Sequence, residues 1–169
     1  MKIRDDDSLA IADVMFDRSN IIIYTNRGEY CYMSVKNIAE QAKDAMGLIT
    51  MRVNDDDFVR GFAPVGTDDE FVVIITDKGM VKKVAKKYFG SPGRRGSLAD
   101  QGSLVTLDAT DGVRFASGMA KGQLVTIAMR NQVVTFKEED IPDMTKKAKG
   151  KHMVSCTPTA NIVAVSVHD

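Results

Sequence analysis

Residues 76–83 read TDKGMVKK, and this short stretch decides the fold. A run of β-branched residues, 72–75, comes directly before it, and the apolar residue Val81 follows the turn. Gly79 suits the tip of a hairpin because glycine adopts a positive φ without steric strain. The stretch therefore predicts two antiparallel strands joined by a tight turn.

The same pattern occurs three times, at a period of about fifty residues. The matching turns read TNRG at 25–28 and AMRN at 128–131, which places Gly28, Gly79 and Asn131 in one column. Asn is the residue after Gly that best tolerates a positive φ. We therefore expect three equivalent hairpins. Their first strands are expected to be buried on both faces, because β-branched apolar runs precede the turns at 21–24, 72–75 and 124–127.

Each repeat ends with a polar turn and a further strand. Aspartates or an asparagine mark these turns, at 55–57, 111 and 161, and the same phrase precedes residues 9–12. We therefore expect an all-β fold with a leading strand at 8–16 and about three four-stranded repeats, at 20–66, 70–121 and 122–169. A short helix is expected only at 35–45. Such repeats are typical of propeller blades, and three blades would form either an open arc or a piece of a larger propeller.

Positive charge is concentrated locally, although 23 basic and 23 acidic residues give the chain a net charge of zero. Between positions 78 and 95 all charged side chains are basic: Lys78, Lys82, Lys83, Lys86, Lys87, Arg94 and Arg95. The matching loop of the third repeat adds Lys146, Lys147, Lys149 and Lys151. A glycine-rich loop, 90–97, would let its arginines approach phosphates closely. These residues predict binding to nucleic acid or another polyanion. The alternatives are a solvated basic face and a protein-interaction propeller whose basic face binds an acidic partner.

The sequence offers little for catalysis. The histidines are His152 and His168, with no Cys/His spacing of a zinc site and no phosphate-binding Gly-Lys-Ser/Thr loop. The aspartates at 5–7 and 55–57 are better explained as turns than as cation ligands. We expect no catalytic site, no cofactor and no metal. Two cysteines, no long apolar stretch and no signal-peptide pattern indicate a cytoplasmic protein without a membrane partner. Binding to DNA would make it nucleoid-associated.

Three phrases resemble a known family: the hairpin 76–83, Asp111-Gly112-Val113, and EEDIP at 138–142. They are similar to the blades of the C-terminal domain found in the A subunits of DNA gyrase and topoisomerase IV, over residues 9–167. The resemblance implies a β-pinwheel, a propeller-like fold whose blades exchange strands, with double-stranded DNA bent around a basic outer rim. It also implies a larger enzyme, in which another domain of the same polypeptide carries the DNA-cleaving tyrosine and a partner subunit binds ATP.

The sequence departs from the gyrase pattern in one loop. Gyrase has a box of Gln, two Arg and a Gly/Lys-rich tail, whereas here Gly93 precedes Arg94 and Arg95, and Ser97 and Leu98 follow Gly96. The chain also supplies fewer blades than the family usually has. The resemblance therefore favours a topoisomerase IV-like domain over a gyrase-like one. We expect it to bend a short arc of DNA without base preference and to present DNA segments to the cleavage core.

Overall fold

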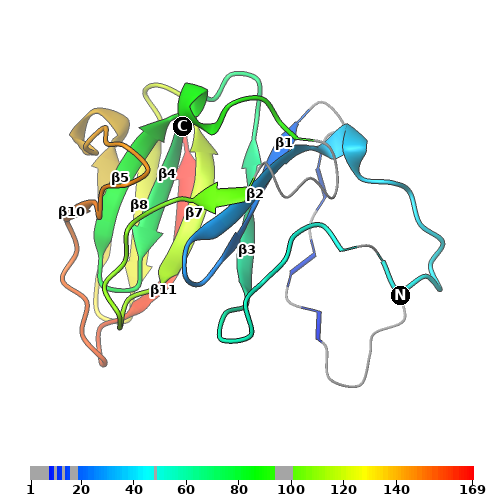
Figure 1. The fold of residues 1–169 in the computed structure, drawn as a ribbon. Helices are drawn as coiled ribbons and strands as arrows, with labels where there is room; N and C mark the ends of the chain where they lie inside the picture. The colour runs from blue at the N-terminus through cyan, green and yellow to red at the C-terminus, as the bar shows by residue number, and fades with distance from the viewer. Residues whose placement is uncertain (1–7, 10, 13, 16–18, 48, 94–100) are drawn as a thin grey trace.

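The computed structural model describes residues 8–9, 11–12, 14–15, 19–47, 49–93 and 101–169. Its strands form three antiparallel sheets, each built around one of the expected hairpins (Figure 1). Sheet one is built from β1 (Asn20–Thr25), β2 (Glu29–Ser34), β3 (Val59–Val65) and β6 (Gln101–Ser103). Sheet two contains β4 (Phe71–Thr76), β5 (Met80–Ala85), β7 (Val113–Met119) and β10 (Lys151–His152). Sheet three contains β8 (Leu124–Met129), β9 (Val133–Lys137) and β11 (Ile162–His168).

The sheets exchange strands along the chain. The strand order of sheet one is β3-β1-β2-β6, and that of sheet two is β10-β5-β4-β7. Each repeat therefore gives three strands to its own sheet, while β6 of the second repeat and β10 of the third complete the preceding sheet. This is the pinwheel arrangement that the resemblance implies, and the all-β prediction is confirmed.

The leading strand expected at 8–16 stays a prediction: residues 8–9, 11–12 and 14–15 carry no strand, and residues 10, 13 and 16 lie outside the described part of the chain. One prediction is corrected in the first repeat. The helix expected at 35–45 is reduced to the 3-10 turn η1 (Val35–Asn37). Ile38 remains 46% exposed, so the apolar stripe of this segment has no surface to pack on, and a helix this short is marginal without packing.

The hairpins of repeats one and two share one turn, and the third has another. Gly28 and Gly79 adopt φ of +84° and +79°, and each donates its N–H to the carbonyl of a threonine three residues earlier. In the third hairpin Met129 donates its N–H to the carbonyl of Gln132, so the bonded pair encloses two residues, 130 and 131, and the pairing register differs from that of the other two hairpins. Positive φ among the described residues occurs only at glycines. The prediction that Asn131 takes the glycine role is therefore wrong, because the third hairpin has no left-handed position.

The core lies between successive sheets. On β4, Val72 and Ile74 pack toward sheet one, while Val73 and Ile75 pack toward sheet three. This double burial explains the continuous apolar run of β4. Strand β8 alternates between buried and half-buried residues, since the described chain packs on one face of sheet three. The expectation that 124–127 is buried on both faces is therefore corrected.

Gly28 and Gly79 give a matched stability test. A Cβ at Gly79 would lie 1.9 Å from the backbone carbonyl oxygen of Val154, whereas a Cβ at Gly28 would lie 3.2 Å from a methyl group of Val105. Both alanine variants lose about 1–2 kcal/mol to the left-handed backbone. We expect Gly79→Ala, and likewise Gly79→Asn, to lose clearly more, because the segment that carries β10 must move. Urea unfolding of both alanine variants checks this, and equal losses would contradict it.

Candidate nucleic-acid interface

Lys82, predicted to bind phosphate, lies inside the molecule. The residue is only 1% exposed, and its Nζ donates to the carbonyl oxygens of Thr145 (2.9 Å), Lys146 (3.0 Å) and Ala148 (2.8 Å). Burial lowers the pKa of Lys82 from 10.5 to about 8, since the charged form is desolvated. Lys82 thus fastens the segment before β10 to β5, and its prediction as a DNA contact is corrected.

Lys83 is also internal. It is 7% exposed, and its Nζ binds the carboxylate of Glu138 and donates to the Glu138 carbonyl at 2.9 Å. The hydrogen bond from Lys83 lowers the pKa of the Glu138 carboxyl. The ammonium also lies 4.7 Å from the centre of the Phe71 ring. The prediction of a phosphate contact at Lys83 is therefore corrected as well.

A signal for this burial exists in the repeat alignment. Lys82 and Lys83 occupy the columns that hold Cys31 and Tyr32 in repeat one, and both of those residues are buried. A lysine in a column that is apolar elsewhere indicates an ammonium solvated by backbone carbonyls rather than by water.

Two further lysines bind protein groups while remaining partly accessible. The Nζ of Lys86 donates to the carbonyls of Gly66 (2.7 Å) and Thr67 (3.1 Å). The Nζ of Lys146 donates to the hydroxyl of Tyr30 at 2.7 Å, which ties the third repeat to sheet one. Lys87 is exposed, with its ammonium 5.3 Å from the centre of the neighbouring Tyr88 ring.

Four exposed lysines remain on β10 and on the loops that border it, and we call them the rim cluster: Lys78, Lys147, Lys149 and Lys151. Lys149 forms an ion pair with Asp108, and Lys78 donates to Thr110 Oγ1 at 2.5 Å. The hydrogen bond and charge of Lys149, with a smaller effect of Lys78, lower the pKa of the Asp108 carboxyl. Lys78 and Lys149 therefore tie the loop at 108–110 to this edge of sheet two.

The predicted arginines Arg94 and Arg95 lie outside the described residues. Before them, Gly93 donates its N–H to the carbonyl of Tyr32 at 2.9 Å, and after them β6 pairs with β2. Parallel bridges join Gly93 to Met33 and Asp143 to Lys83, so the chain crosses to the preceding sheet at equivalent places. The rim lysines at 147–151 thus follow the crossing point of the third repeat.

The aspartates of the polar turns accept hydrogen bonds from backbone N–H groups and thereby stabilise the turns. Asp57 Oδ1 accepts hydrogen bonds from the backbone of Arg27 (3.1 Å) and Phe58 (2.9 Å). Asp111 Oδ1 accepts them from the backbone of Lys78 (3.0 Å) and Gly112 (2.9 Å). In both repeats the carboxylate joins the hairpin tip to the start of the next strand, as expected for turn residues. Within the described ranges no group of three or more His, Cys, Asp or Glu side chains is placed to hold a metal ion.

Sequence reasoning missed two arginines, Arg60 and Arg114. Both form ion pairs with Asp77, at 3.4 and 3.7 Å. The signal is a shared Val-Arg pair that follows an aspartate turn in repeats one and two.

In the part of the chain that the structure covers, no helix is long and apolar enough to cross a membrane.

These features define a β-pinwheel domain with basic exchanged segments. The family model described as "DNA gyrase C-terminal domain, beta-propeller" matches residues 20–66, 70–96 and 122–169, and the chain belongs to this family. The resemblance seen in the sequence is thereby confirmed.

Relatives and solved structures agree with this assignment. The chain is 24% identical to the DNA gyrase A subunit of Haemophilus influenzae, over 95% of this chain and 18% of the relative. It is 26% identical to the DNA gyrase A subunit of Klebsiella oxytoca, over 98% of this chain and 19% of that relative. A C-terminal domain of DNA topoisomerase IV superposes with a TM-score of 0.83 at 15% identity, covering 98% of this chain and 51% of that one. A C-terminal domain of DNA gyrase A superposes with a TM-score of 0.73 at 17% identity, covering 94% of this chain and 52% of that one. The chain thus spans about half of these solved domains and about a fifth of the relatives.

The buried ammonium of Lys82 predicts a distinctive pH dependence. Between about pH 8 and its ordinary pKa of 10.5, the unfolded chain holds a proton here that the folded chain has lost. Stability should therefore rise with pH, by at most about 1.4 kcal/mol per pH unit. In Lys82→Met this rise should vanish. Urea unfolding of both proteins between about pH 8 and 9.5 measures it. The pKa values of Tyr24 and Tyr32 are raised, which opposes the rise at higher pH in both proteins alike. Parallel pH profiles would contradict the assignment.

Proposed function

We propose that this chain is the DNA-binding accessory domain of a type II topoisomerase A subunit, and that it binds duplex DNA along the outer edges of its sheets. The rim cluster carries this proposal. Its lysines are exposed on β10 and the loops that border it, where strand exchange places the basic segment 147–151 on the edge of the preceding blade. In the whole protein, DNA cleavage would belong to the remainder of the same polypeptide, and ATP binding to a partner subunit.

The binding we propose does not read base sequence. Lysine ammonium groups are compact point charges that neutralise phosphates, and phosphate contacts position DNA without reporting its bases. Such contacts release counterions, so affinity falls steeply with salt concentration. Lys87, Arg94 and Arg95 would extend the rim beyond the cluster.

We further propose that the domain bends a short arc of DNA, as in a topoisomerase IV-like enzyme, and presents segments to the cleavage core. Bending a 20–30 base-pair site by 40–90° costs about 1–6 kcal/mol, so a full wrap needs cations around the whole circumference. Lys82 and Lys83 are buried, and Lys86 is bonded to backbone carbonyls, which leaves fewer cations for DNA than the sequence indicates. The altered arginine box supports the same preference.

Replacing the rim cluster tests the interface. We expect the quadruple variant in which Lys78, Lys147, Lys149 and Lys151 become Gln to bind all duplex sequences more weakly. The slope of log affinity against log salt should flatten by about 0.9 for each phosphate that is no longer neutralised. Fluorescence anisotropy with two unrelated duplexes at several salt concentrations measures both effects.

A charge-matched control separates the rim from general electrostatics. The control replaces four exposed cations elsewhere by Gln: Lys36, Lys43, Arg52 and Lys121. We expect it to keep near-native affinity and salt slope. Equal losses of affinity in the two variants would place DNA on another surface. Salt-insensitive or absent duplex binding would favour the protein-interaction alternative.

The wrapping proposal has its own measurement. Relaxed circular plasmid is incubated with the protein, treated with a nicking-closing enzyme and freed of protein, and the change in linking number is counted. We expect little change per bound molecule, because a short bent arc constrains no full superhelical turn. A large change per molecule would indicate a gyrase-like wrap and overturn the topoisomerase IV-like assignment.

A further inference from the structure

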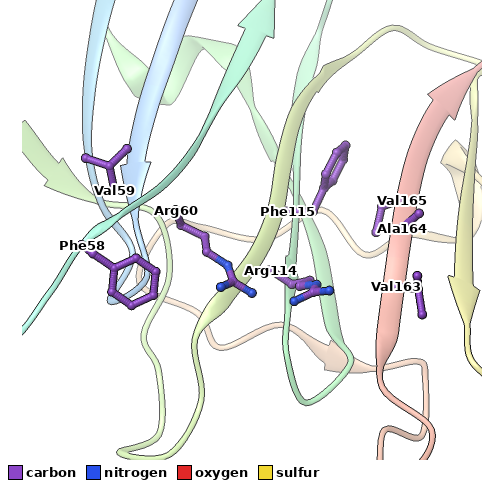
Figure 2. Close-up of a pocket in the computed structure, with 8 residues that line it drawn as sticks. All are labelled: Phe58, Val59, Arg60, Arg114, Phe115, Val163, Ala164 and Val165. Atoms are coloured by element: carbon purple, nitrogen blue, oxygen red, sulfur yellow. The ribbon is translucent and has the colours of Figure 1, made fainter. Parts of the chain in front are cut away.

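A cavity of about 450 Å³ lies where the strands β3, β7 and β11 begin, at the sheet edges opposite to β6 and β10. Its lining comes from all three repeats, as Figure 2 shows: Phe58, Arg60, Arg114, Phe115, Val163 and Val165. The rim lysines at 147–151 lie at the other edge of sheet two, whereas Lys78 directly follows Asp77 at the hairpin tip. The residues that line the cavity are not among those proposed to bind DNA.

Three equivalent β-bulges build this cavity. The pairing register slips between Tyr24 and Thr25, between Ile75 and Thr76, and between Ile162 and Ala164. The residue that the strand pairing skips is Arg60 in the first repeat, Arg114 in the second and Val163 in the third. A bulge redirects its side chain out of the regular alternation, and bulges are frequent beside binding sites. Each repeat thus contributes one bulge side chain to the cavity, and two of the three are arginines.

The cavity carries an excess of positive charge. Arg60 Nη2 lies 3.4 Å and Arg114 Nη1 lies 3.7 Å from the same atom, Asp77 Oδ1. Arg114 Nη2 also donates to the carbonyl of Ile162 at 2.5 Å, which fixes its orientation. One carboxylate shared by two guanidiniums leaves a net positive charge, and each guanidinium has five N–H donors. Their side chains are 24% and 29% exposed, so the donors are accessible yet partly desolvated.

We propose that this cavity binds an acidic peptide segment in which an aspartate or glutamate is flanked by apolar residues. The planar guanidinium fork matches a carboxylate, and partial burial strengthens that hydrogen bond. Phe58 lies on one side of the paired guanidiniums and Val163 on the other, with Phe115 nearby, so apolar walls flank the charged centre (Figure 2). A DNA duplex is too wide to enter a cavity of this volume. The charge and the apolar walls together favour a peptide.

The test uses the labelled peptide acetyl-Ser-Val-Asp-Leu-Glu-Val-Ser-amide with the full chain and no DNA, followed by anisotropy. We expect saturable binding, and binding about tenfold weaker when Asn and Gln replace Asp and Glu. The double variant Arg60→Gln with Arg114→Gln should weaken binding by a similar factor. Arg130→Gln removes an exposed cation from the hairpin tip of sheet three and should bind normally.

Variants at the third bulge keep the inference testable if the double variant is unstable. Val163 is 58% exposed, so substitutions there should preserve the fold, which circular dichroism checks. Val163→Arg completes the set of bulge arginines and should tighten peptide binding severalfold. Val163→Trp fills the cavity, leaves both guanidiniums in place and should abolish binding.

The outcomes separate this inference from the proposed DNA interface. Peptide binding that survives Val163→Trp, or that ignores the Asn/Gln exchange, would overturn it. So would a loss of duplex binding in the arginine double variant without any peptide binding, since the arginines would then serve DNA. Peptide binding by a chain that binds no duplex would support this inference and refute the proposed function.

Discussion

The ammonium group of Lys82, held by three backbone carbonyls, is the interaction on which the architecture of the second blade depends. Those carbonyls belong to the third repeat, whereas Lys82 is in the middle of β5 in the second. A backbone segment without regular structure has few ways to satisfy its carbonyl groups at a sheet edge. One buried cation satisfies three of them and fixes the path of the chain toward β10. Lys83 does the same for the start of this segment through Glu138. The exposed lysines at 147–151 are thus placed by two lysines that are themselves buried.

Strand exchange also explains how burial varies from sheet to sheet. Sheet two has neighbours on both faces and receives a fourth strand, and the residues of β4 after Phe71 are buried. In the described chain sheet three receives no exchanged strand, and β9 alternates between exposed and half-buried residues. Its far face is polar, with the Thr126 hydroxyl 2.9 Å from both Thr135 Oγ1 and His168 Nε2. Stability in such an array comes from each repeat and from its interface with its neighbours, so a blade separated from the next repeat would lose its edge strand as well as its core.

The sequence predicted what depends on local chemistry and missed what depends on register. Apolar β-branched runs and glycines at a fixed period were sufficient for the hairpins and the pinwheel, because these features repeat in columns. The prediction for Asn131 was wrong because the third hairpin pairs in a different register and has no positive φ at this position, although its sequence is similar. The prediction that Lys82 contacts phosphate was wrong because charge alone does not distinguish a cation in water from one bound to backbone carbonyls. Arg60 and Arg114 were missed because their role comes from a register slip between strands, which the shared Val-Arg pair marks in the sequence but does not explain.

The fold uses two backbone devices to place two kinds of cation on opposite edges of its sheets. Exchanged segments carry lysines to the outer edge, where compact, hydrated charges suit the phosphates of a large polyanion. Bulges direct arginines to the opposite edge, where a rigid fork suits the carboxylate of Asp77. A net charge of zero hides this separation, because the composition sums over both edges. Side chains at a bulge or on an exchanged loop contribute little to the core. Such positions can change their ligand without changing the fold, and Val163, the bulge residue that is not an arginine, shows that the repeats already differ there.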